Sequence, residues 1–319
     1  MLKKLNITPK KIIIGIVVIG LLVIASLTIP HFLSINNILK VMRTSSIVSI
    51  VSFGSAMVII VKGIDLSVGG LIAMCAMISG LLMTSGIPVP IAIIVGLIAG
   101  GLLGLFSGIM VEKLEVPAFI TTLVIGQLAN GLALVLNGGD SLAVSNKSYD
   151  FLGNGKILGI PVSIFITLFF LFLSYFIMNK TKLGTHIYAL GGNKQVVKNQ
   201  GISTAKINYF VFAFSGICAA AAGILLSSQL NTVHPTQGGN YQLDAVAACV
   251  IGGINMAGGE GKVYNAVIGA LIIGFLRNAL NLIGLHPYYQ NLIVGVLIIS
   301  IVAYSMYQRR KKNETSKRF

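Results

Sequence analysis

Residue types that carry out catalysis or bind metals are few in this chain and lie far apart. The histidines fall in loops and at the ends of apolar stretches, at His31, His186, His234 and His286. The cysteines each stand alone within an apolar stretch, at Cys75, Cys218 and Cys249, and their spacing supports neither a metal site nor a disulfide framework. Neither an HExxH nor a GxSxG motif occurs. We therefore expect no enzyme and no metal site.

A phosphate-binding loop is also missing from the sequence. Such a loop needs Ser or Thr directly after its Gly-Lys pair. The pairs Gly155-Lys156 and Gly261-Lys262 are each followed by an aliphatic residue instead. We therefore expect this chain to bind no cofactor of its own, and another chain to supply the motor if ATP drives its function.

Hydrogen-bonding side chains inside apolar stretches are the other candidates for function. A charge within a membrane span is costly and normally faces the bundle interior or a water-filled cavity. Arg277 is such a charge, and either it lines a pathway or it pairs with Asp244 or with backbone carbonyls. The residues predicted to line a polar pathway are Gln127, Asn130, Asp244, Arg277, Asn278 and Asn281.

The elements that would position these residues are membrane-spanning helices. Of the 319 residues, 55% are hydrophobic and 10% are charged, whereas a soluble domain has roughly a quarter charged. Stretches of about 20 apolar residues, long enough to cross a bilayer, fill most of the chain. They run near 12–29, 38–61, 65–85, 88–111, 117–137, 161–179, 207–230, 242–258, 264–285 and 288–306. The predicted fold is an all-α polytopic membrane helix bundle of about ten transmembrane helices, forming one domain over residues 1–319.

Small residues recur at every fourth position in two of these stretches. One row is Gly96, Gly100, Gly104 and Gly108, and the other is Ser215, Ala219, Gly223 and Ser227. Rows of small residues let helix backbones approach closely in lipid, so they predict a tightly packed bundle.

The formal charge of +15 is distributed as in a membrane protein and not as in a nucleic-acid-binding protein. Basic residues gather near both ends of the chain and in the loop at about 180–206, which places these parts in the cytoplasm by the positive-inside rule. Both termini are then cytoplasmic and the number of spans is even. The loop at about 138–160 is external, and it is either a solvated connection or a contact for an external partner.

The sequence KGIDLSVGG, residues 62–70, joins the second span to the third. Gly63 permits a tight turn, Asp65 can cap the next helix through its carboxylate, and Ser67 can add a second local bond. Gly70 closes the motif. The segment is either a capped helix start or a polar element that changes its contacts during a transport cycle.

A second motif, GTHIYALGGNKQVVKNQGI, spans residues 184–202. Asn193 is a good N-cap and Gly201 suits the position after a helix, so a helix of about two turns is expected between them. So short a helix is unstable alone in water. It must dock on its own bundle or on a partner, and Val196 and Val197 offer an apolar surface for this.

The third motif, PTQGGNYQLDAVAACVIGGINMAGGEGK, spans residues 235–262. Gly238 and Gly239 break the chain before the span at 242–258, which itself contains Gly252 and Gly253. Breaks at membrane depth are tolerated where protein packs around them or where they line a wet cavity.

These three motifs, in this order and spacing, resemble the permease subunits of bacterial ABC importers for monosaccharides, the ribose, xylose and arabinose class. The stretch NALNLIGLHPYYQNLIVG, residues 278–295, is also similar, and the ribose members are the nearest likeness. Permeases for nucleosides and branched-chain amino acids share the pattern more loosely.

The resemblance implies a permease in the bacterial cytoplasmic membrane that moves ribose or a related pentose inward by alternating access. Its partners would be an ATPase subunit that binds ATP and Mg²⁺, a second permease copy that is identical or a paralogue, and an external sugar-binding protein. The short helix would be the coupling helix on the ATPase. The loop residues implied in this coupling are Gly184, Gly192, Asn193, Val196, Val197 and Gly201.

Other readings stay open at this point. The cargo of the same machinery could be a nucleoside or an autoinducer-type furanose. A self-sufficient secondary transporter would need acidic residues at mid-membrane for ion coupling. Asp65 and Asp244 lie near span ends, and Glu112 and Glu115 border a turn, so this alternative is disfavoured.

Overall fold

The structure, a computed structural model, describes residues 26–296, 299–300 and 303. The predicted first span at 12–29 lies almost wholly outside these residues, as does the basic cluster at 309–318. The chain divides into two units, which are described one at a time. The smaller unit comprises residues 1–41 and 271–319, and the larger comprises residues 42–270.

Helices dominate the described residues, and six of them are long and apolar enough to cross a membrane. They are α2 (Ile35–Ile60), α4 (Val89–Lys113), α5 (Ala118–Leu136), α7 (Val162–Lys180), α10 (Thr204–Leu230) and α12 (Ala266–Leu282), the last preceded by the short 3₁₀ helix η2 (Val263–Asn265). Two shorter apolar helices are α3 (Val68–Thr84) and α11 (Tyr241–Ile251). A further helix covers 287–296. The predicted all-α membrane bundle is confirmed, whereas the count of about ten stays a prediction.

The helix α11 is much shorter than the span predicted at 242–258. It ends at Ile251, and Gly252 occupies its C-cap. Gly253 follows with a φ of 85°, a left-handed conformation that glycine adopts without strain. Eleven helical residues rise only about 16 Å, roughly half of the hydrocarbon core. The prediction of one continuous spanning helix over 242–258 was therefore wrong, because the glycines end the helix early.

The larger unit is built around α10, which packs along α4 with almost no space between the backbones. A Cβ added at Gly104 would lie 2.2 Å from the Phe212 carbonyl oxygen, and one added at Gly100 would lie 2.5 Å from the Gly216 carbonyl oxygen. The predicted row of small residues on α4 is thus confirmed as a helix contact. It makes α4 and α10 a closely joined pair.

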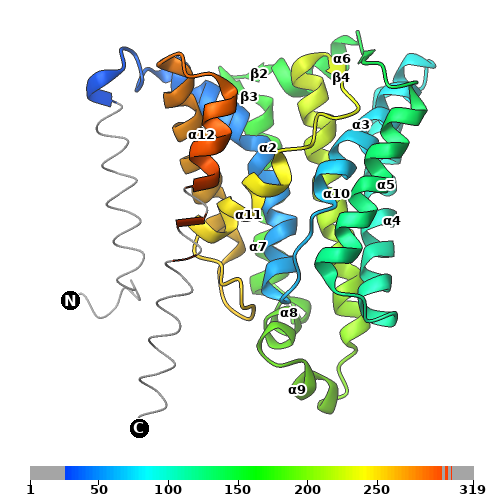
Figure 1. The fold of residues 1–319 in the computed structure, drawn as a ribbon. Coiled ribbons are helices and arrows are strands. Elements are labelled where there is room, and N and C mark those ends of the chain that lie inside the picture. The colour runs from blue at the N-terminus through cyan, green and yellow to red at the C-terminus, as the bar shows by residue number, and fades with distance from the viewer. Residues whose placement is uncertain (1–25, 297–298, 301–302, 304–319) are drawn as a thin grey trace. The chain divides into compact units, whose positions relative to one another are not determined.

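The two ends of the larger unit carry different short elements (Figure 1). At one end, called the α6 end, lie α6 (Lys147–Asn154) and the strands β1 (Leu142–Ala143), β2 (Lys156–Ile157), β3 (Ile160–Pro161) and β4 (Thr232–Val233). The strands form two antiparallel pairs, β1 with β4 and β2 with β3. At the opposite end, called the α9 end, lie α8 (Lys182–Gly192) and α9 (Lys194–Asn199).

The loop at about 138–160, predicted to be external, is packed against α10. Its residue Tyr149 is fully buried, and the Tyr149 hydroxyl group donates to the Ile224 carbonyl oxygen at 2.9 Å. Burial raises the pKa of Tyr149 to about 12. The loop is therefore folded onto the bundle and is more than a solvated connection.

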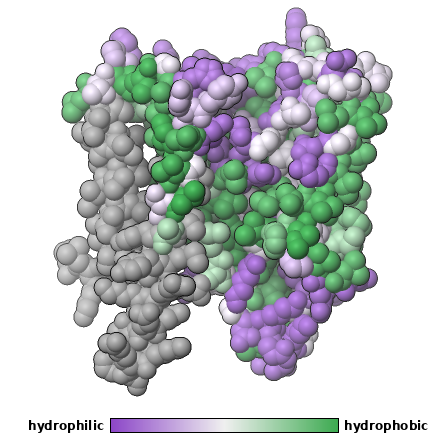
Figure 2. Space-filling view, viewed as in Figure 1, coloured by the Kyte–Doolittle hydropathy of each residue, from purple (hydrophilic) through white to green (hydrophobic). Residues whose placement is uncertain are grey.

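In Figure 2 apolar residues cover much of the middle of the larger unit, and polar residues gather at both its α9 end and its α6 end. Only 28% of the residues in the most apolar stretch of α4 are buried, whereas 83% of those in α10 are buried. Large side chains such as Ile94, Ile98 and Leu102 of α4 are exposed. Exposed aliphatic rows of this length suit contact with lipid.

Within the smaller unit, the chain before α2 packs against α12. The rings of Phe32 and Phe275 meet edge to face with centroids 6.1 Å apart. Asn37 and Asn278 exchange two side-chain hydrogen bonds of 2.8 and 3.0 Å. Buried polar groups need hydrogen-bond partners, and the two amide groups supply them to each other.

Candidate functional site

The three sequence motifs meet at the α9 end of the larger unit. The Gly259 backbone N–H donates to the Ile60 carbonyl oxygen at 2.8 Å. A Cβ added at Gly191 would lie 1.8 Å from the same oxygen and 2.5 Å from the Gly259 nitrogen. The end of α2, the end of α8 and the loop at 252–262 are thus in backbone contact. We call Ile60, Gly191 and Gly259 the three-motif junction.

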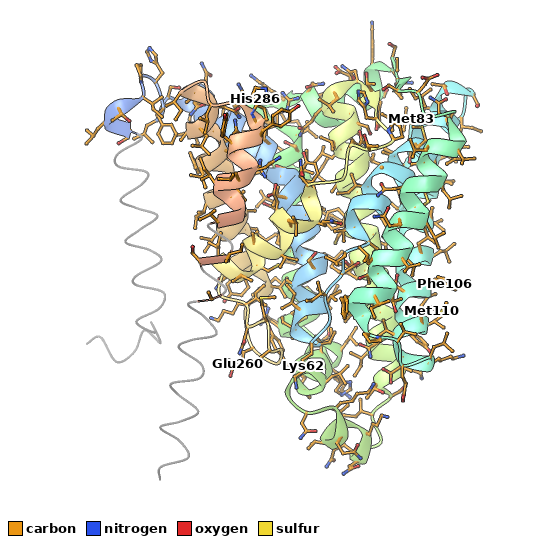
Figure 3. The ribbon with its side chains drawn as sticks, in the orientation of Figure 1. Lys62, Met83, Phe106, Met110, Glu260 and His286 are labelled. Carbon is orange, nitrogen blue, oxygen red and sulfur yellow. The ribbon has the colours of Figure 1, made fainter. Side chains whose placement is uncertain are left out.

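Two side chains reinforce this junction. The Lys62 Nζ donates to the Gly192 carbonyl oxygen at 3.1 Å, and the Tyr188 hydroxyl group donates to the Gly261 carbonyl oxygen at 2.7 Å. Burial raises the pKa of Tyr188 above its usual value. Lys62 and Glu260 lie at the same end of the unit, and Met83 lies at the other end (Figure 3).

Asp65 holds two helices together and is not simply a helix cap. The helix α3 begins at Val68 with Ser67 at the N-cap. The Asp65 carboxylate accepts from the Ser67 backbone N–H at 2.9 Å and from the Ser67 hydroxyl group. It also accepts from the Ser215 hydroxyl group of α10 at 2.7 Å. The expectation of a cap on the next helix was too narrow, because the side chain also binds a residue 150 positions away.

The other members of the first motif serve close packing. Lys62 is the left-handed residue of the turn, with a φ of 68°, and Gly63 follows it with its backbone N–H donating to the Val58 carbonyl oxygen at 2.8 Å. At Gly63 an added Cβ would lie 2.8 Å from the Val58 side chain, and at Gly70 one would lie 2.1 Å from the Gly126 carbonyl oxygen of α5. Both glycines therefore lie where a side chain would not fit.

The predicted short helix is confirmed as α9. The Asn193 side chain accepts from the backbone N–H groups of Gln195 and Val196, and Gly201 follows the helix with a φ of 72°. The two valines differ, since Val197 is 2% exposed and Val196 is 54% exposed. One apolar side chain thus anchors α9 to its own bundle and the other is available to a partner.

The remaining glycines of this loop have unequal surroundings. A Cβ added at Gly184 would lie 2.3 Å from the Met178 carbonyl oxygen, which shows how tightly α8 turns away from α7. At Gly192 an added Cβ would meet nothing within 4 Å. Gly192 contributes its carbonyl oxygen, which Lys62 binds.

Glu112, at the end of α4, is a residue of this site that the motifs did not predict. Its carboxylate accepts from the Lys194 Nζ at 2.8 Å and from the Asn208 Nδ2 at 2.6 Å, both at Oε2. The Thr204 hydroxyl group donates to Oε1. The sequence gives only a weak signal for it, an acidic residue at the end of a glycine-rich span.

A cavity of about 240 Å³ opens beside these groups. The ends of α2 and α4, the α8–α9 turn and the start of α10 contribute its walls. Its polar lining residues include Lys62, Glu112, Lys194 and Asn208. The site thus combines an exposed short helix, a buried anchor and a partly enclosed set of charges.

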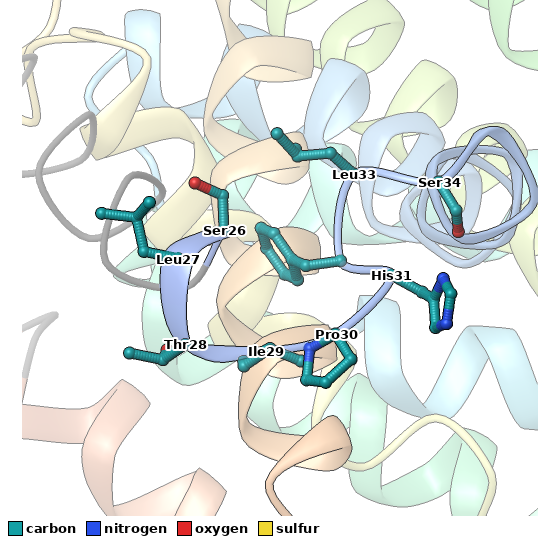
Figure 4. A pocket seen from close by; sticks show the side chains of 9 residues that line it. Ser26, Leu27, Thr28, Ile29, Pro30, His31, Leu33 and Ser34 are labelled. Carbon is teal, nitrogen blue, oxygen red and sulfur yellow. The ribbon is translucent and has the colours of Figure 1, made fainter.

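A second cavity, of about 400 Å³, lies in the smaller unit and is lined by residues 26–34 (Figure 4). A single turn of chain forms it, with side chains such as Ser26, Thr28 and His31 around it. None of the motifs contributes to it, so it is not the candidate site.

The residues predicted to line a pathway fall in both units. Gln127 of α5 is exposed and Asn130 is partly exposed, while Asp244 of α11 is buried. In the smaller unit, the Arg277 Nη1 donates to Asn291 at 3.1 Å, and the Gln290 side chain donates to Asn281 at 2.8 Å. These contacts and the pairing of Asn278 with Asn37 account for α12 residues structurally, and their role in a pathway stays a prediction.

Comparison with known proteins decides the family. Residues 37–302 match the family described as the permease component of the branched-chain amino acid transport system. The chain belongs to this permease family. Within it, the permease is of the ribose class of ABC sugar permeases, as the motifs predict, and it is a multi-pass protein of the bacterial cytoplasmic membrane.

The permease is similar to several curated sugar permeases along nearly its whole length. It is 40% identical to the ribose import permease of Haemophilus influenzae, over 93% of each chain. It is 36% identical to the D-allose permease of Escherichia coli, over 88% of this chain and 86% of that one. It is 29% identical to an L-arabinose permease of Azospirillum brasilense, over 93% and 88%. No solved structure matches the permease.

Proposed function

We propose that this chain is the membrane subunit of an ABC importer that moves a monosaccharide, ribose or a related pentose first, into the cytoplasm. The names of its relatives, which transport ribose, allose and arabinose, support a sugar cargo. A separate ATPase binds ATP and Mg²⁺ and drives alternating access, since this chain has no phosphate-binding loop and brings no cofactor of its own.

The observation that carries this proposal is the exposed, capped helix α9 beside the three-motif junction. Its exposed face, with Val196 and Lys198, seats on the ATPase as a coupling helix, while Val197 keeps it attached to the permease. Movement of α9 then reaches three distant segments at once, because they share backbone contacts.

The distribution of charge supports the orientation. The loop at the α9 end carries Lys180, Lys182, Lys194, Lys198 and Lys206. The α6 end carries Lys147 and Lys156 in its loop. The positive-inside rule then assigns the α9 end to the cytoplasm and the α6 end to the outside, with both termini inside and about ten spans. The external sugar-binding protein would meet the α6 end.

A second permease copy, identical or a paralogue, completes the pathway. Gln127 lies exposed on α5 among aliphatic side chains such as Leu123, Val124 and Leu128. A hydrogen-bonding group is unfavourable in contact with hydrocarbon. This face of α5 is therefore better suited to a wet pathway between copies, lined also by Asn130, than to lipid.

Reconstitution in lipid vesicles tests the proposal. The permease, its ATPase and its binding protein are incorporated together, and uptake of labelled ribose, allose, arabinose and a nucleoside is measured with and without ATP. We expect uptake of a sugar that requires ATP and all three components. Uptake by the permease alone, unaffected by ATP, would contradict the proposal. Uptake of the nucleoside and of no sugar would show that the cargo is a nucleoside.

A further inference from the structure

Glu112 connects three helices through one carboxylate. Lys194 is the first residue of α9, and Thr204 and Asn208 lie in the first two turns of α10. Both oxygens of Glu112 are used, Oε1 by Thr204 and Oε2 by Lys194 and Asn208. The Glu112 side chain is 9% exposed and the Lys194 side chain is 48% exposed.

The helices that Glu112 joins are close-packed where it lies. A Cβ added at Gly108 of α4 would lie 3.0 Å from the Asn208 carbonyl oxygen of α10, only one turn before Glu112. Because α4 and α10 are in backbone contact along their length, a force on Glu112 acts on both helices together. Packed helices move as units, since their interfaces do not deform continuously.

The short helix α9 has few other attachments to this pair. Val197 packs into the core, and the backbone joins α9 to α8 and α10. The Lys194 side chain adds an ion pair with Glu112 to these attachments. This ion pair is a directional contact by which α9 can pull on α4.

We infer that Glu112 is a positioning residue that transmits the movement of α9 to α4 and α10, so that its loss separates ATP hydrolysis from sugar transport. The inference rests on the proposed function, because it assumes that α9 is moved by the ATPase. Half-exposed ion pairs contribute little to folding stability. The role inferred for this pair is to link α9 to α4.

The test uses the complete transporter in lipid vesicles and measures ribose taken up per ATP hydrolysed. The variants are Glu112→Gln and Lys194→Gln. Glu115→Gln is the matched control, since Glu115 lies three positions further on, is exposed, and makes no hydrogen bond or ion pair within the described residues. We expect both site variants to remain bound to the ATPase subunit. The ratio of ribose taken up to ATP hydrolysed should fall by about fivefold or more, which is a typical size for the coupling between two sites. The control keeps the wild-type ratio.

The double variant Glu112→Lys with Lys194→Glu, called the exchanged pair, separates a role in coupling from a role in stability alone. The measured quantity is again ribose taken up per ATP hydrolysed. It restores the opposite charges, and we expect it to recover part of the ratio, because a lysine at position 112 cannot accept from Thr204 or Asn208. Glu112→Lys alone places two lysines together and should not recover it. Equal ratios for Glu112→Gln and Glu115→Gln, or a ratio in the exchanged pair no higher than in Glu112→Lys alone, would overturn the inference.

Two further outcomes are distinguishable. If Glu112→Gln cannot be purified with its ATPase, Lys194→Gln decides, because that side chain is half exposed and tolerates substitution. An unchanged ratio there would overturn the inference. A wild-type transporter without ATP-driven uptake would instead contradict the proposed function, and the inference with it.

Discussion

Tyr149 carries its hydroxyl group from the loop at 138–160 into the bundle. There it donates to the Ile224 carbonyl oxygen and lies within hydrogen-bonding distance of the Ser227 hydroxyl group. The Ser228 hydroxyl group donates in turn to the Tyr149 carbonyl oxygen. A residue on an otherwise polar loop thus forms part of the core of the larger unit.

Replacing Tyr149 with Phe should lower the stability of the permease by about 1 kcal/mol or somewhat more, because buried groups of α10 lose a partner. Thermal unfolding in detergent measures this change. Tyr289→Phe is the control, since Tyr289 is 62% exposed. Equal melting temperatures for the two variants would contradict the assigned role of the hydroxyl group.

At the scale of elements, α9 illustrates how one short helix serves two surfaces. Its cap at Asn193 is local, whereas its position depends on Val197 and on the ion pair of Lys194 with Glu112. Val196, in contrast, is 54% exposed.

The two valines of α9 should therefore respond differently to aspartate. Val197→Asp places a carboxylate in the core and should cost more than about 2 kcal/mol of stability. Val196→Asp should change stability by less than about 0.5 kcal/mol, as surface substitutions do, yet it should reduce stimulation of the ATPase. Melting temperature and ATP hydrolysis are measured for both variants. Normal transport by Val196→Asp would count against α9 as the coupling helix.

The contact of α4 with α10 is a second feature at this scale, and it requires the absence of side chains. Gly104→Ala would bring a methyl group to 2.2 Å from the Phe212 carbonyl oxygen. Because the two backbones must separate, we expect a loss of about 1–3 kcal/mol in stability. At Gly131 of α5 an added Cβ meets nothing within 4 Å, so Gly131→Ala should leave the melting temperature unchanged or slightly higher. A similar loss in both variants would show that packing is not the cause.

For the molecule as a whole, the three-motif junction brings together residues that are far apart in sequence. Ile60, Gly191 and Gly259 belong to three different segments, and each makes its contact through the backbone. A change at one of them therefore affects the ends of α2 and α8 and the loop at 252–262 together.

Neighbouring glycines provide a matched test of this junction. Gly191→Ala should destabilise the permease by about 1–3 kcal/mol and abolish most ATP-driven uptake, since its Cβ would overlap the Ile60 carbonyl oxygen. Gly192→Ala should retain uptake, because its Cβ points into open space. Both variants are assayed in vesicles beside the wild type. Full activity in Gly191→Ala would show that the close approach is not needed.

The sequence alone determined the class of this protein and its short local elements. Apolar stretches of bilayer length predict spanning helices because lipid leaves backbone groups no partner but their own helix. The helix between Asn193 and Gly201 follows from its cap and its C-terminal glycine, which are local signals. The glycine row of α4 also predicted a helix contact, although not its partner.

Which distant residues meet could be learned only from the folded chain. The bond of Asp65 to Ser215, the binding of three donors by Glu112 and the contact of Gly191 with Ile60 each join positions far apart in the chain. The sequence near Glu112 resembles any charged span end, and the glycines of the third motif gave no measure of how far α11 would extend. Local patterns record what a segment can form by itself, whereas a contact between segments depends on the packing of all the helices around it.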